Sequence, residues 1–198
     1  MKIIIKRLFI IGLVGIASLQ AHSQTQRMVT QNANGTEEYL YFHYKADYFE
    51  YASGTRPKRI KLITIKRSIA QEGPMVHYVK FPGKKDVYKL VHDGMRLTCT
   101  NPNGSKQVFV SENKYISKGK NGLIEYLYTQ GPPPSYFYNN NRNPKRIELL
   151  IVDGDMITGI FKVKFPGSPK VYKLEGAPNG GILCTNPDGS KQIFIEEK

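Results

Sequence analysis

The feature that most constrains this chain is a twelve-residue segment that occurs twice. The sequence CTNPNGSKQVFV at 99–110 returns as CTNPDGSKQIFI at 184–195, with nine of the twelve positions identical. Four shorter blocks recur in the same order, 84 to 87 residues apart: EYLY at 38–41 and 125–128, PKRI at 57–60 and 144–147, KFPG at 80–83 and 164–167, and VYKL at 87–90 and 171–174. Such spacing indicates a duplicated unit. The sequence therefore predicts two tandem modules, 24–112 and 113–198, joined by the polar stretch 111–122.

The repeated blocks have the character of strands and tight turns. IFKVKF at 160–165 alternates apolar and basic residues, which is typical of a half-buried strand, whereas RIELLIV at 146–152 is apolar on both faces. Asn-Pro-Asn-Gly at 101–104 and Asn-Pro-Asp-Gly at 186–189 suit tight reversals, because Pro presets φ and Gly accepts a positive φ. The Asp-Gly pair at 153–154 likewise predicts a hairpin turn.

These patterns predict an all-β fold. The expected strands lie at 37–44, 59–66, 75–81, 87–91, 96–100 and 106–111, and again at 124–129, 146–152, 158–165, 171–174, 182–185 and 191–196. We therefore expect two tandem repeated antiparallel modules of about six strands each, with hairpin or meander connections, built as a small barrel or sandwich. The two modules are either separate or share one core. The two-faced strands at 59–65 and 146–152 favour a contact between the modules.

The first 23 residues have the layout of a secretory signal peptide. Lys2, Lys6 and Arg7 precede an apolar run at 8–19, and Ala21-His22-Ser23 ends the segment. This run is too short for a lasting membrane helix, which needs about 20 apolar residues. We expect cleavage near Ser23, a mature chain without a transmembrane span, and a secreted or periplasmic location. An uncleaved N-terminal anchor is the alternative.

The expected mature chain is strongly basic. The whole sequence has 29 Lys and Arg residues against 16 Asp and Glu residues, and removing 1–23 leaves 175 residues with a formal charge of +10. This excess favours an anionic partner such as an acidic polysaccharide, a lipopolysaccharide or an acidic protein face. Export makes intracellular nucleic acid the least expected partner. The other explanation is solubility and the protection of strand edges by exposed Lys.

Basic and aromatic residues at matched or neighbouring positions are the candidate binding residues, since Tyr and Arg are enriched in binding hot spots. The candidates are Lys58, Arg59, Lys145, Arg146, Tyr41, Tyr128, Tyr136, Phe137 and Tyr138. The last three lie in GPPPSYFYNNNRNP at 131–144, which we expect to be an exposed loop and a contact surface. The alternative is that the tyrosines fill a half-buried sheet face.

Residues suited to catalysis or to metal binding are sparse. His43, His77 and His92 are the only histidines of the expected mature chain, and no pair has the spacing of a metal site. Glu38 and Glu125 occupy matched positions, as a glycosidase with two carboxylates across a cleft would require, although an acid at an exposed strand start is the simpler explanation. We predict no catalytic residue, no metal and no cofactor.

The two cysteines, Cys99 and Cys184, occupy the same position in the two modules. In an exported chain they invite a disulfide, which would need the two equivalent strands to meet with Cα atoms about 5–6 Å apart. Otherwise each cysteine is a small buried core residue.

Together these features predict a secreted or periplasmic, non-enzymatic binding protein whose basic, Tyr-rich surface contacts a protein or an anionic glycan. A structural scaffold of the cell envelope is the first alternative. A hydrolase or metal-dependent enzyme, with a His-based site in the first module, is the second.

Overall fold

The computed structural model describes residues 25–32, 34–54, 56–68, 73–131 and 133–197. Within these ranges the regular structure is β, apart from one short 3₁₀ turn, η1 (Lys120–Gly122). The prediction of an all-β fold is therefore confirmed. The predicted signal peptide at 1–23 lies outside the described residues. In the described part of the chain, no helix is long and apolar enough to cross a membrane.

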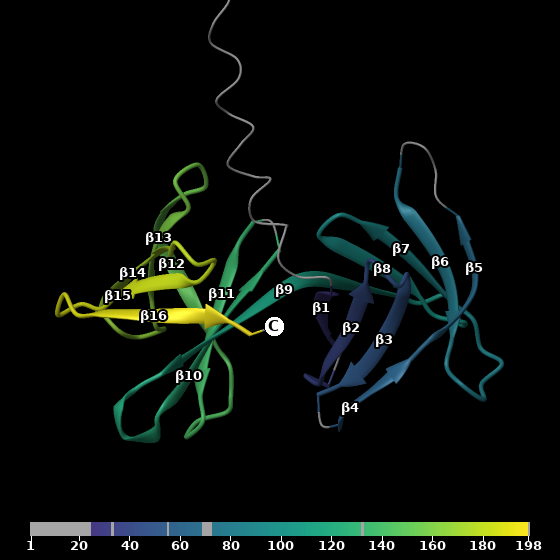
Figure 1. Ribbon diagram of the computed structural model, residues 1–198, viewed down its shortest axis with the longest axis horizontal. Coiled ribbons are helices and arrows are strands. Elements are labelled where there is room, and N and C mark those ends of the chain that lie inside the picture. The colour runs from purple at the N-terminus through teal and green to yellow at the C-terminus, as the bar shows by residue number, and fades with distance from the viewer. Residues whose placement is uncertain (1–24, 33, 55, 69–72, 132, 198) are drawn as a thin grey trace, which may run out of the picture.

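Within the described residues, sixteen strands follow one another (Figure 1). They are β1 (Thr25–Gln31), β2 (Glu37–His43), β3 (Tyr48–Ser53), β4 (Arg56–Lys61), β5 (Ile63–Ser68), β6 (Met75–Lys80), β7 (Tyr88–Asp93), β8 (Arg96–Thr100), β9 (Lys106–Lys118), β10 (Ile124–Gln130), β11 (Ser135–Asn140), β12 (Ile147–Asp155), β13 (Ile160–Lys164), β14 (Val171–Gly176), β15 (Ile182–Thr185) and β16 (Lys191–Glu196). The expectation of about six strands per module missed β1, β3 and β11, and it took β4 and β5 for one strand at 59–66.

Strands β9 to β16 close into an eight-stranded antiparallel barrel. Each strand from β10 to β15 pairs with the next one along the chain, and β9 completes the ring by pairing with both β10 and β16. A closed ring leaves no strand edge free within the barrel. The prediction of a small barrel is thus confirmed for this part of the chain.

The remaining strands attach to the first part of β9. Residues 106–111 of this thirteen-residue strand lie beside β8 and β1, and residues 112–118 lie beside β10. From β9 the sheet continues through β1 to β4 on one side and through β8, β7, β6 and β5 on the other. The polar stretch expected to join two modules is therefore mostly strand, and the two halves of the structure share β9 (Figure 1).

Equivalent residues of the repeated blocks face equivalent partners across the strands of the two halves. The matching pairs are Leu40 with Tyr51 and Leu127 with Tyr138, Leu90 with Cys99 and Leu174 with Cys184, and Cys99 with Gln107 and Cys184 with Gln192. Two clusters of buried side chains fill the interior, one around Phe42 and Leu90 in the first half and one around Leu127 and Leu174 in the second.

Of the predicted turns, the two Asn-Pro-x-Gly reversals are confirmed. Gly104 and Gly189 have φ values of 82° and 83°, and their N–H groups donate to the carbonyls of Asn101 and Asn186 at 2.9 Å. The hairpin predicted at Asp153-Gly154 is wrong. Strand β12 continues to Asp155, and the chain reverses over residues 156–159.

The segment 131–144 is not the exposed loop that its proline and asparagine content predicts. Strand β11 occupies its centre and pairs with β10 and β12, so that Tyr136 lies in the core with 7% of its surface exposed. The prolines end before the strand begins, and the Ser-Tyr-Phe-Tyr run that follows has a high preference for β structure.

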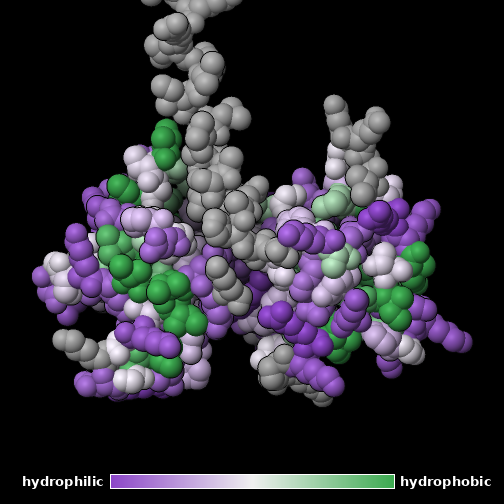
Figure 2. Space-filling view, in the orientation of Figure 1, coloured by the Kyte–Doolittle hydropathy of each residue, from purple (hydrophilic) through white to green (hydrophobic). Residues whose placement is uncertain are grey.

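The apolar outer faces of the two-faced strands do not form a contact between the halves. Ile60 and Ile63 beside Leu62, and Leu150 and Val152 of β12, are all at least 41% exposed. Figure 2 shows apolar patches on the visible surface of both halves, within a mostly hydrophilic surface. The contact between the halves is instead polar, as described below.

Candidate functional site

A pocket opens at the equivalent end of each half of the structure. The first, with a cavity of about 310 Å³, is lined by Glu38, Leu40, Tyr51, Leu62, Val79, Phe81, Tyr88, Leu90, Cys99, Asn101, Gln107 and Phe109. The second, of about 110 Å³, is lined by Glu125, Leu127, Tyr138, Leu149, Val163, Phe165, Tyr172, Leu174, Cys184, Asn186, Gln192 and Phe194. Taken in chain order, the two sets are identical in residue type at all twelve positions.

Each pocket has an apolar floor and a rim of polar and aromatic groups. In the first half the floor consists of buried side chains, such as Leu40, Leu90 and Phe109. The rim consists of half-buried side chains: Glu38, Tyr51, Phe81, Tyr88, Asn101 and Gln107. Strand periodicity explains this order, because residues two apart on a strand, such as Glu38 and Leu40, point to the same face at different depths.

The carboxylate on each rim is held by hydrogen bonds. In the first pocket the Gln107 side chain donates to Glu38 Oε2 at 3.2 Å, and the Asn32 side chain donates to Glu38 Oε1 at 3.3 Å. In the second pocket Gln192 donates to Glu125 Oε2, and the Tyr138 hydroxyl donates to Glu125 Oε1 at 2.7 Å.

Three aromatic rings form one wall of each pocket. In the first half Tyr51 packs edge-to-face on Phe81 with ring centres 5.2 Å apart, and Phe81 packs on Tyr88 at 5.5 Å. The second half repeats this with Tyr138, Phe165 and Tyr172 at 5.1 and 5.5 Å. Edge-to-face stacking restricts the orientation of each ring, and all three rings line the pocket.

Cys99 and Cys184 are buried free thiols, and one lies in each pocket. Of the two possibilities considered from sequence, the structure has the buried cysteines and not the disulfide. Each thiol lies 3.7–3.8 Å from the side-chain oxygen of the asparagine two residues later. Burial raises the pKa of Cys99 to about 11, with help from the charge of Glu38. Burial and Glu125 do the same for Cys184.

The structure scatters the nine predicted binding residues over four environments. Lys58, Lys145 and Arg59 are exposed, and Arg59 stacks on Tyr41 with its guanidinium carbon 3.9 Å from the ring centre. Tyr136 belongs to the core, Tyr138 to the second pocket, and Phe137, its neighbour on β11, is half-buried. Arg146 and Tyr128 lie in the contact between the halves, where Arg146 stacks on Tyr128 at 3.8 Å.

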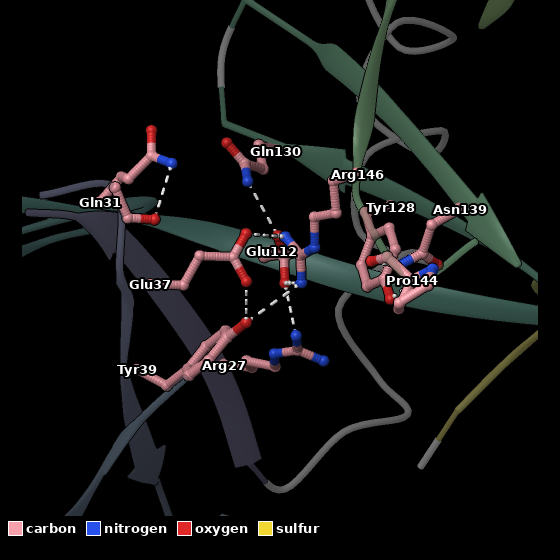
Figure 3. Close-up of polar contacts among 11 residues, drawn as sticks. Arg27, Gln31, Glu37, Tyr39, Glu112, Tyr128, Gln130, Asn139, Pro144 and Arg146 are labelled. Carbon is pink, nitrogen blue, oxygen red and sulfur yellow. Dashed lines mark hydrogen bonds and ion pairs between the residues drawn. The ribbon is translucent and has the colours of Figure 1, made fainter. Parts of the chain in front are cut away.

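That contact centres on the fully buried carboxylate of Glu112 in β9 (Figure 3). Arg27 of β1 and Arg146 each approach Glu112 to 2.7 Å, and Gln130 donates a further hydrogen bond at 2.8 Å. Arg146 also pairs with Glu37 at 3.1 Å. Because Arg27 and Glu37 come from the first half and Arg146 from the second, we name these residues the junction network.

The three histidines do not converge on one site. His77 and His92 are buried against Phe42, with ring centres 5.8 and 5.4 Å from it. His43 follows Phe42 on strand β2, but its ring stacks on Tyr48 and contacts Glu50 and Thr25 instead. Within the described residues, no group of three or more His, Cys, Asp or Glu side chains is arranged to hold a metal ion.

The repeated sequence blocks were a signal for the pockets, although the chemistry of their residues did not point to a pocket. Four of the five repeated blocks supply lining residues, including Glu38 from EYLY, Phe81 from KFPG and Tyr88 from VYKL, whereas PKRI supplies none. Tyr51 lies outside the blocks, yet it is also matched, by Tyr138. Searches of known protein families, curated proteins and solved structures found no match to this chain.

Proposed function

We propose that this chain is an exported, non-enzymatic binding protein. Its two halves are copies of one duplicated barrel module, and each copy takes a small ligand group into the pocket at its end. The observation that carries this proposal is the identity of all twelve lining residues between the two pockets.

The identity of the lining residues is informative because the next layer of inward-facing residues differs between the two halves. Two residues further from the pocket along five strands, the paired residues all differ: Phe42 and Thr129, Phe49 and Tyr136, His77 and Phe161, His92 and Gly176, and Leu97 and Ile182. In the first half all five of these side chains are buried. Packing acts on both layers, so it allows both to change by compensating substitutions. A ligand shared by both pockets therefore explains better than core packing why only the pocket-lining residues are identical in the two halves.

The composition of the pockets favours binding over catalysis. Each lining set contains one carboxylate and no histidine. General acid–base hydrolysis by carboxylates needs two such groups facing the substrate. An apolar floor with a few oriented polar groups at the rim is typical of a site that binds small ligands.

A fragment screen by NMR tests the proposal, using isotope-labelled protein and small molecules of varied charge. We expect bound fragments to shift the signals of lining residues in both halves. The double variant Q107W/Q192W covers both rims and should lose these shifts. The matched variant K106W/K191W places the same side chains at exposed neighbouring positions and should keep them. Fragments that bind only elsewhere, or that bind both variants equally, would contradict the proposal.

A second candidate function rests on the exposed basic residues. Lys58, Lys145 and the Arg59–Tyr41 stack lie on the surface, where they suit a protein or an anionic glycan. Retention on heparin above about 0.3 M salt would support such a polyanion site, because diffuse charge attraction is screened at that ionic strength. Elution well below it would leave only the general basicity of the chain.

Export is the part of the proposal that rests on residues 1–23. The expected outcome is that the protein purified from its natural source begins at Gln24, as N-terminal sequencing would show. A chain that keeps Lys2 to Ser23 would contradict cleavage and favour the uncleaved anchor.

A further inference from the structure

Among the side chains that the structure describes, the rim glutamates of the two pockets have no positively charged partner. Other acidic residues, among them Glu37, Glu50 and Glu112, form ion pairs with Arg or Lys. Among the described residues, neither Glu38 nor Glu125 forms an ion pair with Lys, Arg or His. This is unexpected in a chain with 29 cationic side chains.

The hydrogen bonds that hold these glutamates leave room for another donor. Each carboxylate accepts one hydrogen bond at each of its two oxygens from the protein. An ionised carboxylate has about four acceptor positions, so two remain in each pocket. Neutral amide and hydroxyl donors orient the carboxylate without neutralising it.

The aromatic wall beside each glutamate also suits a cation. Tyr51, Phe81 and Tyr88 line the first pocket together with Glu38, and their equivalents line the second together with Glu125. The faces of aromatic rings carry partial negative charge and attract cations, ammonium groups in particular. The remaining polar lining groups are an amide pair and a thiol, which bring no positive charge to the pocket.

We propose that each pocket binds an alkylammonium group, with the ammonium at Glu38 or Glu125 and the alkyl chain on the apolar floor. This inference rests on the proposed function and specifies its ligand. The cavities, about 310 and 110 Å³, are at or below the lower end of the range for drug-sized ligands. They therefore suit a short amine or the end of a lysine side chain.

The overall positive charge of the protein does not oppose such binding at physiological salt. Exposed charges more than about 8 Å away are largely screened there, whereas a contact inside a half-buried pocket is screened much less. The carboxylate and the rings therefore dominate the local interaction.

Titrations with three probes of similar size and different charge test this inference. They are n-butylammonium, 1-butanol and butyrate, added at fixed ionic strength to isotope-labelled protein and followed by NMR shifts of the lining residues. We expect butylammonium to bind both pockets at least about tenfold more tightly than the other two, since a charge-assisted hydrogen bond is roughly twice as strong as a neutral one.

Isosteric variants assign the effect to the glutamates. E38Q should weaken butylammonium binding in the first pocket by about tenfold or more and leave the second unchanged, and E125Q should do the reverse. E148Q, at an exposed residue of β12, is the matched control and should change neither. Because each single variant keeps one intact pocket, a folding defect would be visible as a change in both.

The outcomes separate this inference from the proposed function. If 1-butanol binds both pockets as well as butylammonium, and the Gln variants change nothing, the pockets bind ligands but not through a cation. If no probe and no fragment shifts the lining residues, the proposed function fails as well. Nα-acetyl-lysine methylamide distinguishes the two sources of the group: tighter binding than that of butylammonium indicates a lysine of a partner protein, and weaker binding indicates a free amine.

Discussion

His77 and His92 are buried in the first half, and their ring nitrogens have no hydrogen-bond partner among the residues that the structure describes. Burial lowers the pKa of both rings, and the nearby Gly94 backbone partly opposes this for His92 without forming a well-aligned hydrogen bond. A neutral imidazole is thus favoured in the folded state. The second half has Phe161 and Gly176 at these positions, so the fold itself does not require the histidines.

The first prediction is that acid destabilises the protein through these residues. A histidine with a lowered folded pKa binds its proton mainly in the unfolded chain, so its contribution is constant above pH about 6.5 and is lost as the pH falls below it. Urea unfolding at pH 7.5 and 5.0 measures the loss. H77F, which copies the second half, should reduce the loss, whereas H43Q should keep it. An equal loss in H77F and the original protein would contradict the prediction.

The second prediction concerns Cys99 and Cys184, whose pKa of about 11 makes both thiols poorly reactive at neutral pH. Because the thiolate is the reactive form, the rate of alkylation should rise about tenfold per pH unit from pH 8 to 10. Measuring this rate in C184S and in C99S reports each pocket separately. In urea the curve should level off near pH 9, as for an ordinary thiol. Levelling near pH 9 in the folded protein would contradict the prediction.

At the scale of strands and turns, the strands with strong apolar patterns and the Asn-Pro-x-Gly reversals could be predicted from sequence. Strand β3 was missed because only 37–44 of this Tyr-rich region was expected to be a strand, and β11 was missed because Pro and Asn flank it. The Asp153-Gly154 pair misled for a physical reason. Gly154 lies opposite Phe161 across β12 and β13, where it makes room for the ring and does not form the turn.

The third prediction tests this role of Gly154. A Cβ added there would lie 2.3 Å from Phe161 Cδ1, so G154A should displace a core ring and destabilise the protein by about 1–3 kcal/mol. In G176A, on strand β14 beyond β13, the added Cβ meets no atom within 4 Å, so the stability should change by no more than about 0.5 kcal/mol. Thermal or urea unfolding compares the two variants. Equal stabilities would show that β12 shifts freely to accommodate the methyl group.

For the whole molecule, the junction network and the shared strand β9 tie the two halves together. Neither could be predicted from sequence. The key residue, Glu112, falls at the expected module boundary, and the residue that matches it in the first half is Thr25. Arg59 and Arg146 occupy matched positions, and both were predicted to be surface residues. Arg59 is exposed, but only 14% of the Arg146 side chain is exposed. The difference arises because the surface of the second half is covered by the first.

The fourth prediction is that E112A destabilises the protein by about 3–5 kcal/mol. Removing the carboxylate leaves Arg27 and Arg146 partly buried without their common partner, which is the costly way to break a buried ion pair. E148A, at an exposed site, is the control. Calorimetry of both variants checks the prediction, and equal transition temperatures would show that the junction network adds little to stability.

The pockets also belong to the scale of the whole molecule. Residues from seven separate stretches of each half meet there, and sequence blocks show that they are repeated but not that they face one another. The matched glutamates were identified from sequence, but only as the two carboxylates that a glycosidase would have across one cleft. The structure places each in its own pocket instead, because each half has its own cluster of buried side chains.

The protection of Cys99 and Cys184 against alkylation, measured in C184S and in C99S with small cationic, neutral and anionic compounds present, tests the central claim most directly. Each thiol lies in one pocket, so a bound group shields it. If the two pockets bind the same ligand group, one class of compound should slow both reactions several-fold, at concentrations that leave an exposed reporter thiol unaffected. Reaction rates that no compound changes, or protection confined to one cysteine, would contradict the existence of two equivalent binding sites.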